Sequence, residues 1–123
     1  MKLHLAKSAN TNVITGYGEG YVEVNKQRHQ RSLVVMPDRL WTEWSASTFE
    51  ALTAGDLGAL ADLDREVILL GTGKLLRFPQ PELMRPLIQA GIGLEVMDLA
   101  AACRTYNILV AEERKVAAAL LLS

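Results

Sequence analysis

The chain has 123 residues and a mass of 13.5 kDa, which suits a single domain. Half of its residues are apolar and 22% are charged, the balance of an ordinary globular protein. The formal net charge is −1 and the sequence pI is about 6.1, which argues against a nucleic-acid binder, since such proteins carry a basic excess. The single cysteine, Cys103, excludes an internal disulfide framework and a zinc site built from several cysteines.

No pattern for secretion or membrane insertion is visible. A secretory signal contains about 7–15 consecutive apolar residues, and the start of this chain interrupts its few apolar residues with charges. The longest apolar runs, such as residues 117–122, are far shorter than the roughly 18 residues that span a bilayer. We therefore expect a cytoplasmic protein in a reducing compartment, with no membrane insertion and no bound nucleic acid.

The first half of the sequence predicts β-strands. Residues 12–17 and 21–24 flank a turn made by Gly18-Glu19-Gly20, and glycine adopts the backbone angles that tight turns require. Residues 29–36 predict a third strand, and residues 40–44 predict a fourth because apolar and polar side chains alternate. The short connections favour antiparallel pairing.

The second half alternates between helix and strand patterns. Its continuous apolar runs are typical of buried strands, and its longest helix has an apolar stripe. The expected elements are helical turns at 47–52 and 56–63, a strand at 66–70, a helix at 81–90, a strand at 93–97, a helix at 98–114 and a strand at 115–122. This order predicts an α/β domain over residues 1–123 with a parallel strand pair at its centre.

Gly71-Thr72-Gly73-Lys74 follows a predicted buried strand, so phosphate binding is the first hypothesis to test. A dinucleotide-binding loop needs a third glycine where Leu76 stands. A P-loop needs glycine at Ile68 and serine or threonine at Leu75, so both patterns fail. A tight turn remains one interpretation. The other is a small-ligand or anion loop at a strand end, with Lys74 and Arg77 supplying charge.

Cys103 lies on the apolar stripe of its helix, where cysteine usually behaves as a small buried apolar residue. A catalytic cysteine needs a nearby base, and both histidines, His4 and His29, lie in the other half of the chain. We expect no catalytic residues, no metal site and no cofactor. Asp98 precedes the same helix and is expected to cap its first turn.

Arg104-Thr105-Tyr106-Asn107 is an unusually polar segment for a helix interior. Asn107 borders the buried stripe, and a polar side chain there needs hydrogen-bond partners. Structural bracing is one interpretation. A pocket or docking role for Thr105 and Asn107 is the other.

Four segments in a fixed order resemble a known family of small domains. They are residues 67–73 (VILLGTG), 91–98 (GIGLEVMD), 102–109 (ACRTYNIL) and 114–120 (RKVAAAL), and the resemblance covers about residues 11–122. The family includes mitochondrial complex I assembly factor 3 and the adipogenesis-associated domain protein. Its members often have a threonine after the strand-end aspartate, where this chain has Leu99.

The resemblance implies a three-layer α/β fold with a mixed central sheet and an added N-terminal antiparallel β layer. It implies no established enzymatic activity and no cofactor. The mitochondrial member assists assembly of the membrane-bound NADH dehydrogenase through protein contacts, and a shared fold alone does not transfer that function.

Three functional hypotheses follow. The leading one is a non-enzymatic protein-interaction domain that assists assembly of a respiratory or membrane complex, with respiratory-complex subunits as candidate partners. Its candidate surface combines two segments: Gly71, Thr72, Gly73, Lys74 and Arg77, and Arg104, Thr105, Tyr106 and Asn107. The alternative is a small-molecule or anion-binding protein, or a weak enzyme, with a pocket lined by Lys74, Arg77 and Asn107. The third is a homodimer that uses the exposed β layer or Trp41.

Overall fold

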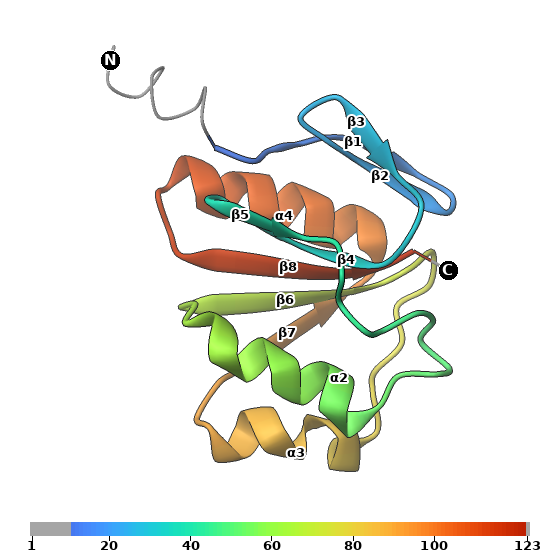
Figure 1. Cartoon of the computed structure of the whole chain (residues 1–123), viewed down its shortest axis with the longest axis vertical. Helices are drawn as coiled ribbons and strands as arrows, with labels where there is room; N and C mark the ends of the chain where they lie inside the picture. Colours follow the sequence, from blue (N-terminus) through green and yellow to red (C-terminus); the bar gives the residue numbers. More distant parts are fainter. Residues whose placement is uncertain (1–10, 123) are drawn as a thin grey trace.

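The computed structural model describes residues 11–122 and contains two sheets (Figure 1). The larger sheet has five strands in the order β5-β4-β8-β6-β7. Its strands are β4 (Leu33–Met36), β5 (Arg39–Trp41), β6 (Val67–Thr72), β7 (Leu94–Met97) and β8 (Val116–Leu121). Strands β7, β6 and β8 are parallel, and β4 and β5 join them in antiparallel order. The mixed α/β sheet expected from the sequence is thereby confirmed.

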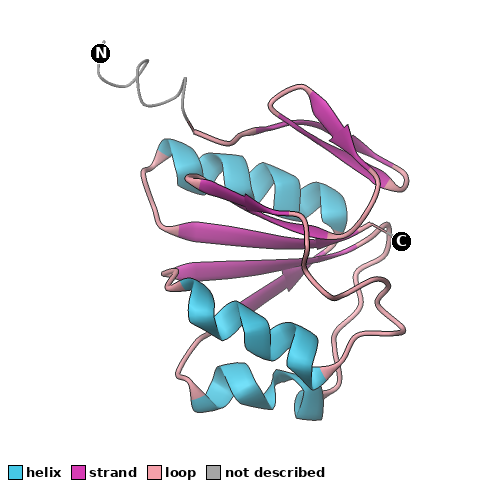
Figure 2. Ribbon diagram, viewed as in Figure 1, coloured by secondary structure: helices cyan, strands magenta, loops and turns pink. Residues whose placement is uncertain are grey.

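Helices cover both faces of this sheet (Figure 2). Helix α4 (Leu99–Ala111) lies on one face, while α2 (Ala54–Gly58), the 3-10 helix η1 (Ala59–Leu63) and α3 (Pro81–Gln89) lie on the other. Successive residues of a strand point to opposite faces, so each apolar strand contributes to both cores. Leu69 faces the α4 side and Leu70 faces the α2 and α3 side, and both are fully buried.

A second, antiparallel sheet forms the added N-terminal layer. It contains β1 (Ile14–Gly18), β2 (Tyr21–Val24) and β3 (Gln27–His29) in that order. Asn25 and Lys26 connect β2 to β3 with positive φ angles of 50° and 72°, as expected for the two central residues of a tight hairpin turn. The sheet packs over α4, and its apolar side chains join the core on that side of the molecule.

Two neighbouring residues of α4 attach this layer to the helix. The Asn107 side-chain oxygen accepts a hydrogen bond from the Ile14 amide at 3.0 Å, and its Nδ2 donates to the Ile14 carbonyl at 2.8 Å. The Tyr106 hydroxyl donates to the Asn12 carbonyl at 2.8 Å. Asn107 thus satisfies both backbone groups of one strand residue, as a neighbouring strand would.

Three local predictions were wrong. Residues 29–36 do not form one strand, because residues 30–32 carry the chain from β3 in the small sheet to β4 in the large one. The expected strand at 40–44 ends at Trp41, and Trp44 is buried with its indole nitrogen donating to the Asp56 carbonyl. Of the helical turn expected at residues 47–52, the structure has only a bend and turn at 49–51, where the Leu52 amide donates to the Phe49 carbonyl at 3.2 Å, and the helix begins after the Thr53 cap.

We expect Asn107→Ala to destabilise the fold by about 2 kcal/mol, because it removes two hydrogen bonds and leaves partly buried groups of Ile14 unpaired. Urea denaturation followed by circular dichroism measures the loss. Thr105→Ala is the control, since Thr105 lies on the same helix and makes no side-chain hydrogen bond within residues 11–122. Equal costs for the two variants would contradict the bracing role of Asn107.

Candidate functional site

The connection after β6 is shaped by Thr72. Its side chain is completely buried, and its hydroxyl donates to the Leu75 carbonyl at 2.6 Å and accepts from the Arg77 amide at 3.1 Å. Gly73 has a φ of +82°, a conformation that glycine adopts without strain, and its carbonyl accepts from the Leu99 amide at 2.8 Å. These contacts hold the turn tightly against the start of α4.

Arg77 fastens the same connection to the loop before α2. Its guanidinium carbon lies 4.5 Å from the centre of the Phe49 ring, and its Nη1 donates to the Glu50 carboxylate. This hydrogen bond to Arg77 lowers the pKa of the Glu50 carboxyl. Arg77 is therefore already paired, and its side chain is 34% exposed.

The start of α4 lies next to this turn. Asp98 caps the helix as expected, because its carboxylate accepts from the Ala101 amide at 2.8 Å. Gly71 permits the close approach. A Cβ atom at Gly71 would lie 3.0 Å from the Leu120 side chain and 3.1 Å from Cβ of Ala102. A larger residue would therefore push α4 away from the sheet.

These elements enclose a groove of about 660 Å³ at the carboxyl ends of β6 and β7. Its walls are the β1–β2 turn, the connection after β6 and the first turn of α4, and most of the surface that they present is apolar. The lining residues are Tyr17, Gly18, Glu19, Gly20, Gly73, Lys74, Leu75, Arg77, Asp98, Leu99, Ala100 and Leu122.

The position of the groove follows from the topology. Strand β6 leads to α3 on one face of the sheet, and the adjacent β7 leads to α4 on the other face. Crevices form where the connections of two adjacent parallel strands diverge in this way, and open α/β sheets bind ligands there. The groove therefore occupies the place at which this kind of fold offers a binding site.

The same end of the molecule gathers exposed apolar side chains. Six large apolar side chains are exposed within residues 11–122: Tyr17, Leu75, Leu76, Phe78, Ile88 and Ile108. Tyr17 and Leu75 line the groove, and Leu76 and Phe78 follow in the same connection. Ile88 and Ile108 stand singly on α3 and α4. Such clustering is typical of an interaction surface, whereas exposed apolar residues that stand singly are ordinary on protein surfaces and indicate none.

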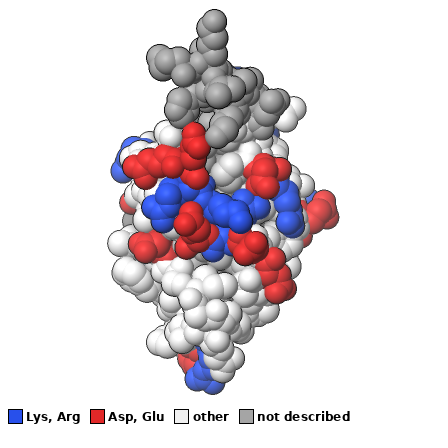
Figure 3. Space-filling model, turned by 90° about the vertical axis from the view of Figure 1, so that its left-hand side faces the viewer, with Lys and Arg blue, Asp and Glu red and all other residues white. Residues whose placement is uncertain are grey.

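The opposite end of the sheet is charged, and three ion pairs lie there. Figure 3 faces this end and shows acidic and basic side chains mixed in a band across its middle. The ion pairs are Arg65–Asp38 at 3.0 Å, Arg114–Glu66 at 3.4 Å and Lys115–Asp64 at 3.9 Å. The domain therefore has a polar end, where the parallel strands begin, and an apolar end, where they finish.

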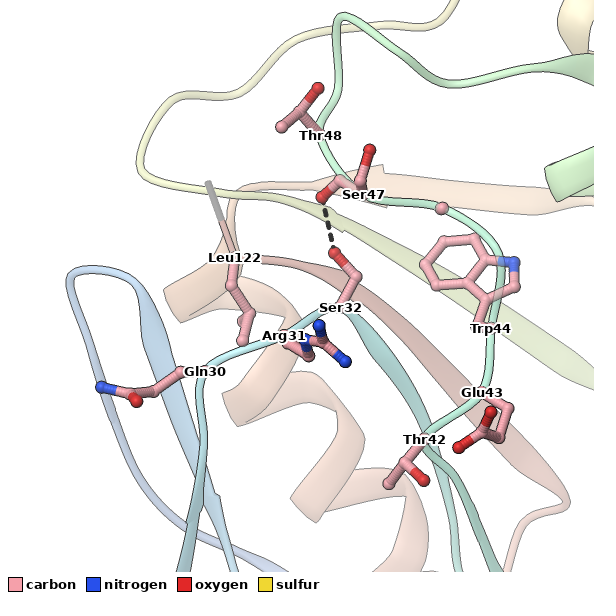
Figure 4. A pocket seen from close by; sticks show the side chains of 10 residues that line it. Gln30, Arg31, Ser32, Thr42, Glu43, Trp44, Ser47, Thr48 and Leu122 are labelled. Carbon is pink, nitrogen blue, oxygen red and sulfur yellow. Dashed lines mark hydrogen bonds between the residues drawn. The ribbon is translucent and has the colours of Figure 1, made fainter.

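A second pocket, of about 420 Å³, lies beside β4 and the loop that follows β5 (Figure 4). It is rich in hydroxyl groups, but two of these already hold the loop in place. Ser32 donates to the Ser47 carbonyl at 2.8 Å, and the Thr48 hydroxyl accepts from the Ala51 amide at 3.1 Å. These groups serve the fold, so the apolar groove is the stronger candidate.

The structure brings only part of the expected surface to the groove. Gly71, Thr72 and Gly73 are buried, while Lys74 is exposed and lines the groove with Arg77. Of the expected pocket residues Lys74, Arg77 and Asn107, the first two line the groove and Asn107 does not.

In the second segment, Arg104 is exposed and its Nη1 donates to the Tyr17 hydroxyl at 3.3 Å. Tyr106 is completely buried, and Asn107 holds β1. Thr105 is half-buried and does not line the groove.

The comparisons with known proteins identify the family. The model for "Protein of unknown function (DUF498/DUF598)" matches residues 14–121, nearly all of the described chain. The chain belongs to the DUF498/DUF598 family. One curated relative is the NADH dehydrogenase [ubiquinone] 1 alpha subcomplex assembly factor 3 of Xenopus tropicalis. It is 29% identical over 105 residues, which are 84% of this chain and 56% of that protein. The chain thus spans little more than half the length of this relative.

Solved structures of bacterial proteins show the same fold. A crystal structure of a Bordetella parapertussis protein has a TM-score of 0.82 and 42% identity, covering 90% of this chain and 95% of that one. A Bartonella henselae structure described as an outer membrane protein has a TM-score of 0.70 and 30% identity, covering 91% and 95%. No helix within residues 11–122 of this DUF498/DUF598 chain is long and apolar enough to cross a membrane.

The sequence interpretation missed the apolar surface itself. Leu75, Leu76 and Phe78 lie between Gly73 and Pro79 and follow neither a helical nor a strand period. Large apolar residues in a connection without a helical or strand period were the feature of the sequence that could have indicated this surface.

Within residues 11–122 no group of three or more histidine, cysteine, aspartate or glutamate side chains is placed to hold a metal ion.

We expect Thr72→Val to destabilise the protein by about 1–3 kcal/mol, because it removes the two loop hydrogen bonds and leaves the Arg77 amide unpaired. Hydrogen exchange of the Arg77 amide should rise at the same time. Thr72→Ser retains the hydroxyl and serves as the control. A Thr72→Val protein with unchanged exchange at Arg77 would argue against the bracing role of Thr72.

We expect Cys103 to resist thiol reagents in the folded protein. Burial raises the pKa of its thiol to about 12, so the reactive thiolate is scarce at pH 8. Reaction with a disulfide reagent should be at least about 1000-fold slower than in the urea-unfolded protein, where the thiol has an ordinary pKa. Rapid labelling of the folded protein at pH 8 would contradict the burial of the Cys103 thiol.

Proposed function

We propose that this protein is a non-enzymatic interaction domain that assists the assembly of a respiratory or membrane complex. The Xenopus relative is named as an assembly factor of NADH dehydrogenase, and the Bartonella relative is described as an outer membrane protein. Both descriptions support a role at a membrane complex. The groove at the carboxyl ends of β6 and β7 is the single structural observation that carries the proposal.

The chemistry of the groove favours binding over catalysis. Two of its charged side chains are already engaged, since Arg77 pairs with Glu50 and Asp98 caps α4. Its exposed apolar surface, by contrast, comes from Leu75 and Tyr17, which are 65% and 38% exposed. Burying such surface against a partner is the main favourable contribution to protein association.

The occupant that we propose is a short apolar segment of a protein subunit. Lys74 stands on the wall of the groove and makes no ion pair within residues 11–122. An acidic side chain of the partner next to its apolar residues would pair with this cation, and charge pairing of that kind selects one partner over others.

The residues chosen to test this proposal must be exposed. Tyr106 is unsuitable, because it is completely buried and its truncation would report on folding. Arg77→Glu would break the contact with Glu50 and disturb the loop. Leu75 is 65% exposed within the groove, and Ile88 on α3 is 63% exposed outside it, so these two residues form a matched pair.

We expect Leu75→Glu to reduce recovery of the partner by at least about tenfold, because a charge replaces an apolar contact at the interface. The measurement is a tagged purification from the host, with soluble and membrane fractions analysed separately by mass spectrometry. Ile88→Glu should recover the partner like the wild type.

Support requires that the recovered protein is a subunit of a respiratory or other membrane complex and that it rebinds the purified domain. Recovery of such a subunit equally by wild type and Leu75→Glu would rule out the groove as its binding site. Absence of any specifically recovered subunit would count against the proposed function as a whole.

A ligand-binding function is the second candidate, and the same open groove with Lys74 on its wall favours it. A thermal-shift screen of small carboxylates and phosphate esters separates it from the first. A compound that raises the melting temperature of the wild type, but not of Lys74→Glu, would support this candidate.

A further inference from the structure

The connection between β6 and α3 presents two large apolar side chains outside the groove. Leu76 is 51% exposed and Phe78 is 68% exposed, and neither lines the groove described above. Their charged neighbours in the sequence are Lys74 and Arg77. The carboxylates close in space are Glu50, which pairs with Arg77, and Glu19 and Asp98, which line the groove together with Lys74. We call residues 74–78 the apical loop.

The apical loop is held in one shape, so the exposure of its apolar side chains is a fixed property of the fold. Thr72 hydrogen-bonds the backbone at Leu75 and at Arg77. Arg77 then packs on Phe49 and pairs with Glu50, which anchors the far side of the loop. Large apolar side chains that stay exposed together mark a surface that contacts a protein, a membrane or a ligand.

We infer that the apical loop docks onto the surface of a lipid bilayer. Leu76 and Phe78 enter the boundary between headgroups and acyl chains, and the Lys74 ammonium lies among the lipid phosphates. Interfacial membrane-binding helices combine Trp, Phe and Leu with Lys and Arg, and the apical loop has a small set of the same residue types. Because Arg77 is neutralised by Glu50, Lys74 supplies the positive charge of the loop that attracts anionic lipid.

The distribution of charge over the molecule supports this orientation. The ion pairs Arg65–Asp38, Arg114–Glu66 and Lys115–Asp64 occupy the opposite end of the sheet, where they remain in water when the apical loop is inserted. The groove lies beside the loop and then faces the zone just above the headgroups. A subunit that emerges from the bilayer would meet it there.

Docking at the surface of a bilayer needs no membrane-spanning run of apolar residues. The expectation of no membrane insertion rested on the absence of such a run, and two side chains that reach the headgroup boundary do not require one. Two apolar side chains and one cation bind a bilayer only weakly, so the binding is reversible. Stable attachment to the membrane would need a second contact. Leu76 and Phe78 lie outside the groove, whereas Lys74 belongs to both surfaces. Substitutions at Leu76 and Phe78 therefore test this inference apart from the proposed function.

Co-sedimentation with vesicles of phosphatidylcholine, with and without phosphatidylglycerol, tests the inference on the purified full chain. We expect the wild type to bind at millimolar lipid and the Leu76→Glu/Phe78→Glu variant to bind at least about tenfold more weakly. Ile108→Glu is the matched control, because Ile108 is 59% exposed on α4. All three proteins should have similar melting temperatures, since the substituted side chains are exposed.

The charge of Lys74 gives a second, independent readout. Phosphatidylglycerol should strengthen wild-type binding about fivefold, as expected for one basic residue at an anionic surface, and Lys74→Glu should remove this gain. Leu75→Glu leaves Leu76 and Phe78 unchanged, so loss of the protein partner with retained vesicle binding in that variant would leave this inference intact. No vesicle binding by the wild type, or equal loss in Ile108→Glu, would overturn it.

Discussion

The close packing around β8 is the constraint on which the rest of the structure depends. This strand lies between β4 and β6, and all six of its side chains are buried. Three successive alanines, Ala117, Ala118 and Ala119, let layers on both faces approach its backbone closely. Interiors are packed as densely as organic crystals, so the position of α4 is fixed by the small side chains beneath it.

The position of α4 then determines where the candidate site lies. Gly71 and Ala102 allow the start of the helix to rest on the end of β6, and the Leu99 amide donates to the Gly73 carbonyl at that contact. Asn107, two turns further along, holds β1 and brings the β1–β2 turn over the same end of the sheet. One helix therefore positions two walls of the groove, and Thr72 shapes the third.

Local physical chemistry was sufficient to predict much of this. The apolar runs at β6 and β8, the Asp98 cap and the burial of Cys103 follow from patterns within a few residues. The division of residues 29–36 between two sheets could not be predicted in this way, because it depends on which strands the two halves pair with. The two hydrogen bonds between the Asn107 side chain and the Ile14 backbone join residues 93 positions apart, a separation at which no local pattern operates.

The apolar end and the charged end have a common origin in strand direction. Because β6, β7 and β8 are parallel, the connections that follow β6 and β7 and the residue that follows β8 meet at one edge of the sheet. Leu75, Leu99 and Leu122 come from these three places and all line the groove. The residues that precede β6 and β8 meet at the other edge, where Glu66 pairs with Arg114. An antiparallel sheet would mix the two sets of connections, so the parallel core is what gives this small domain one end with ion pairs and one end with clustered exposed apolar side chains.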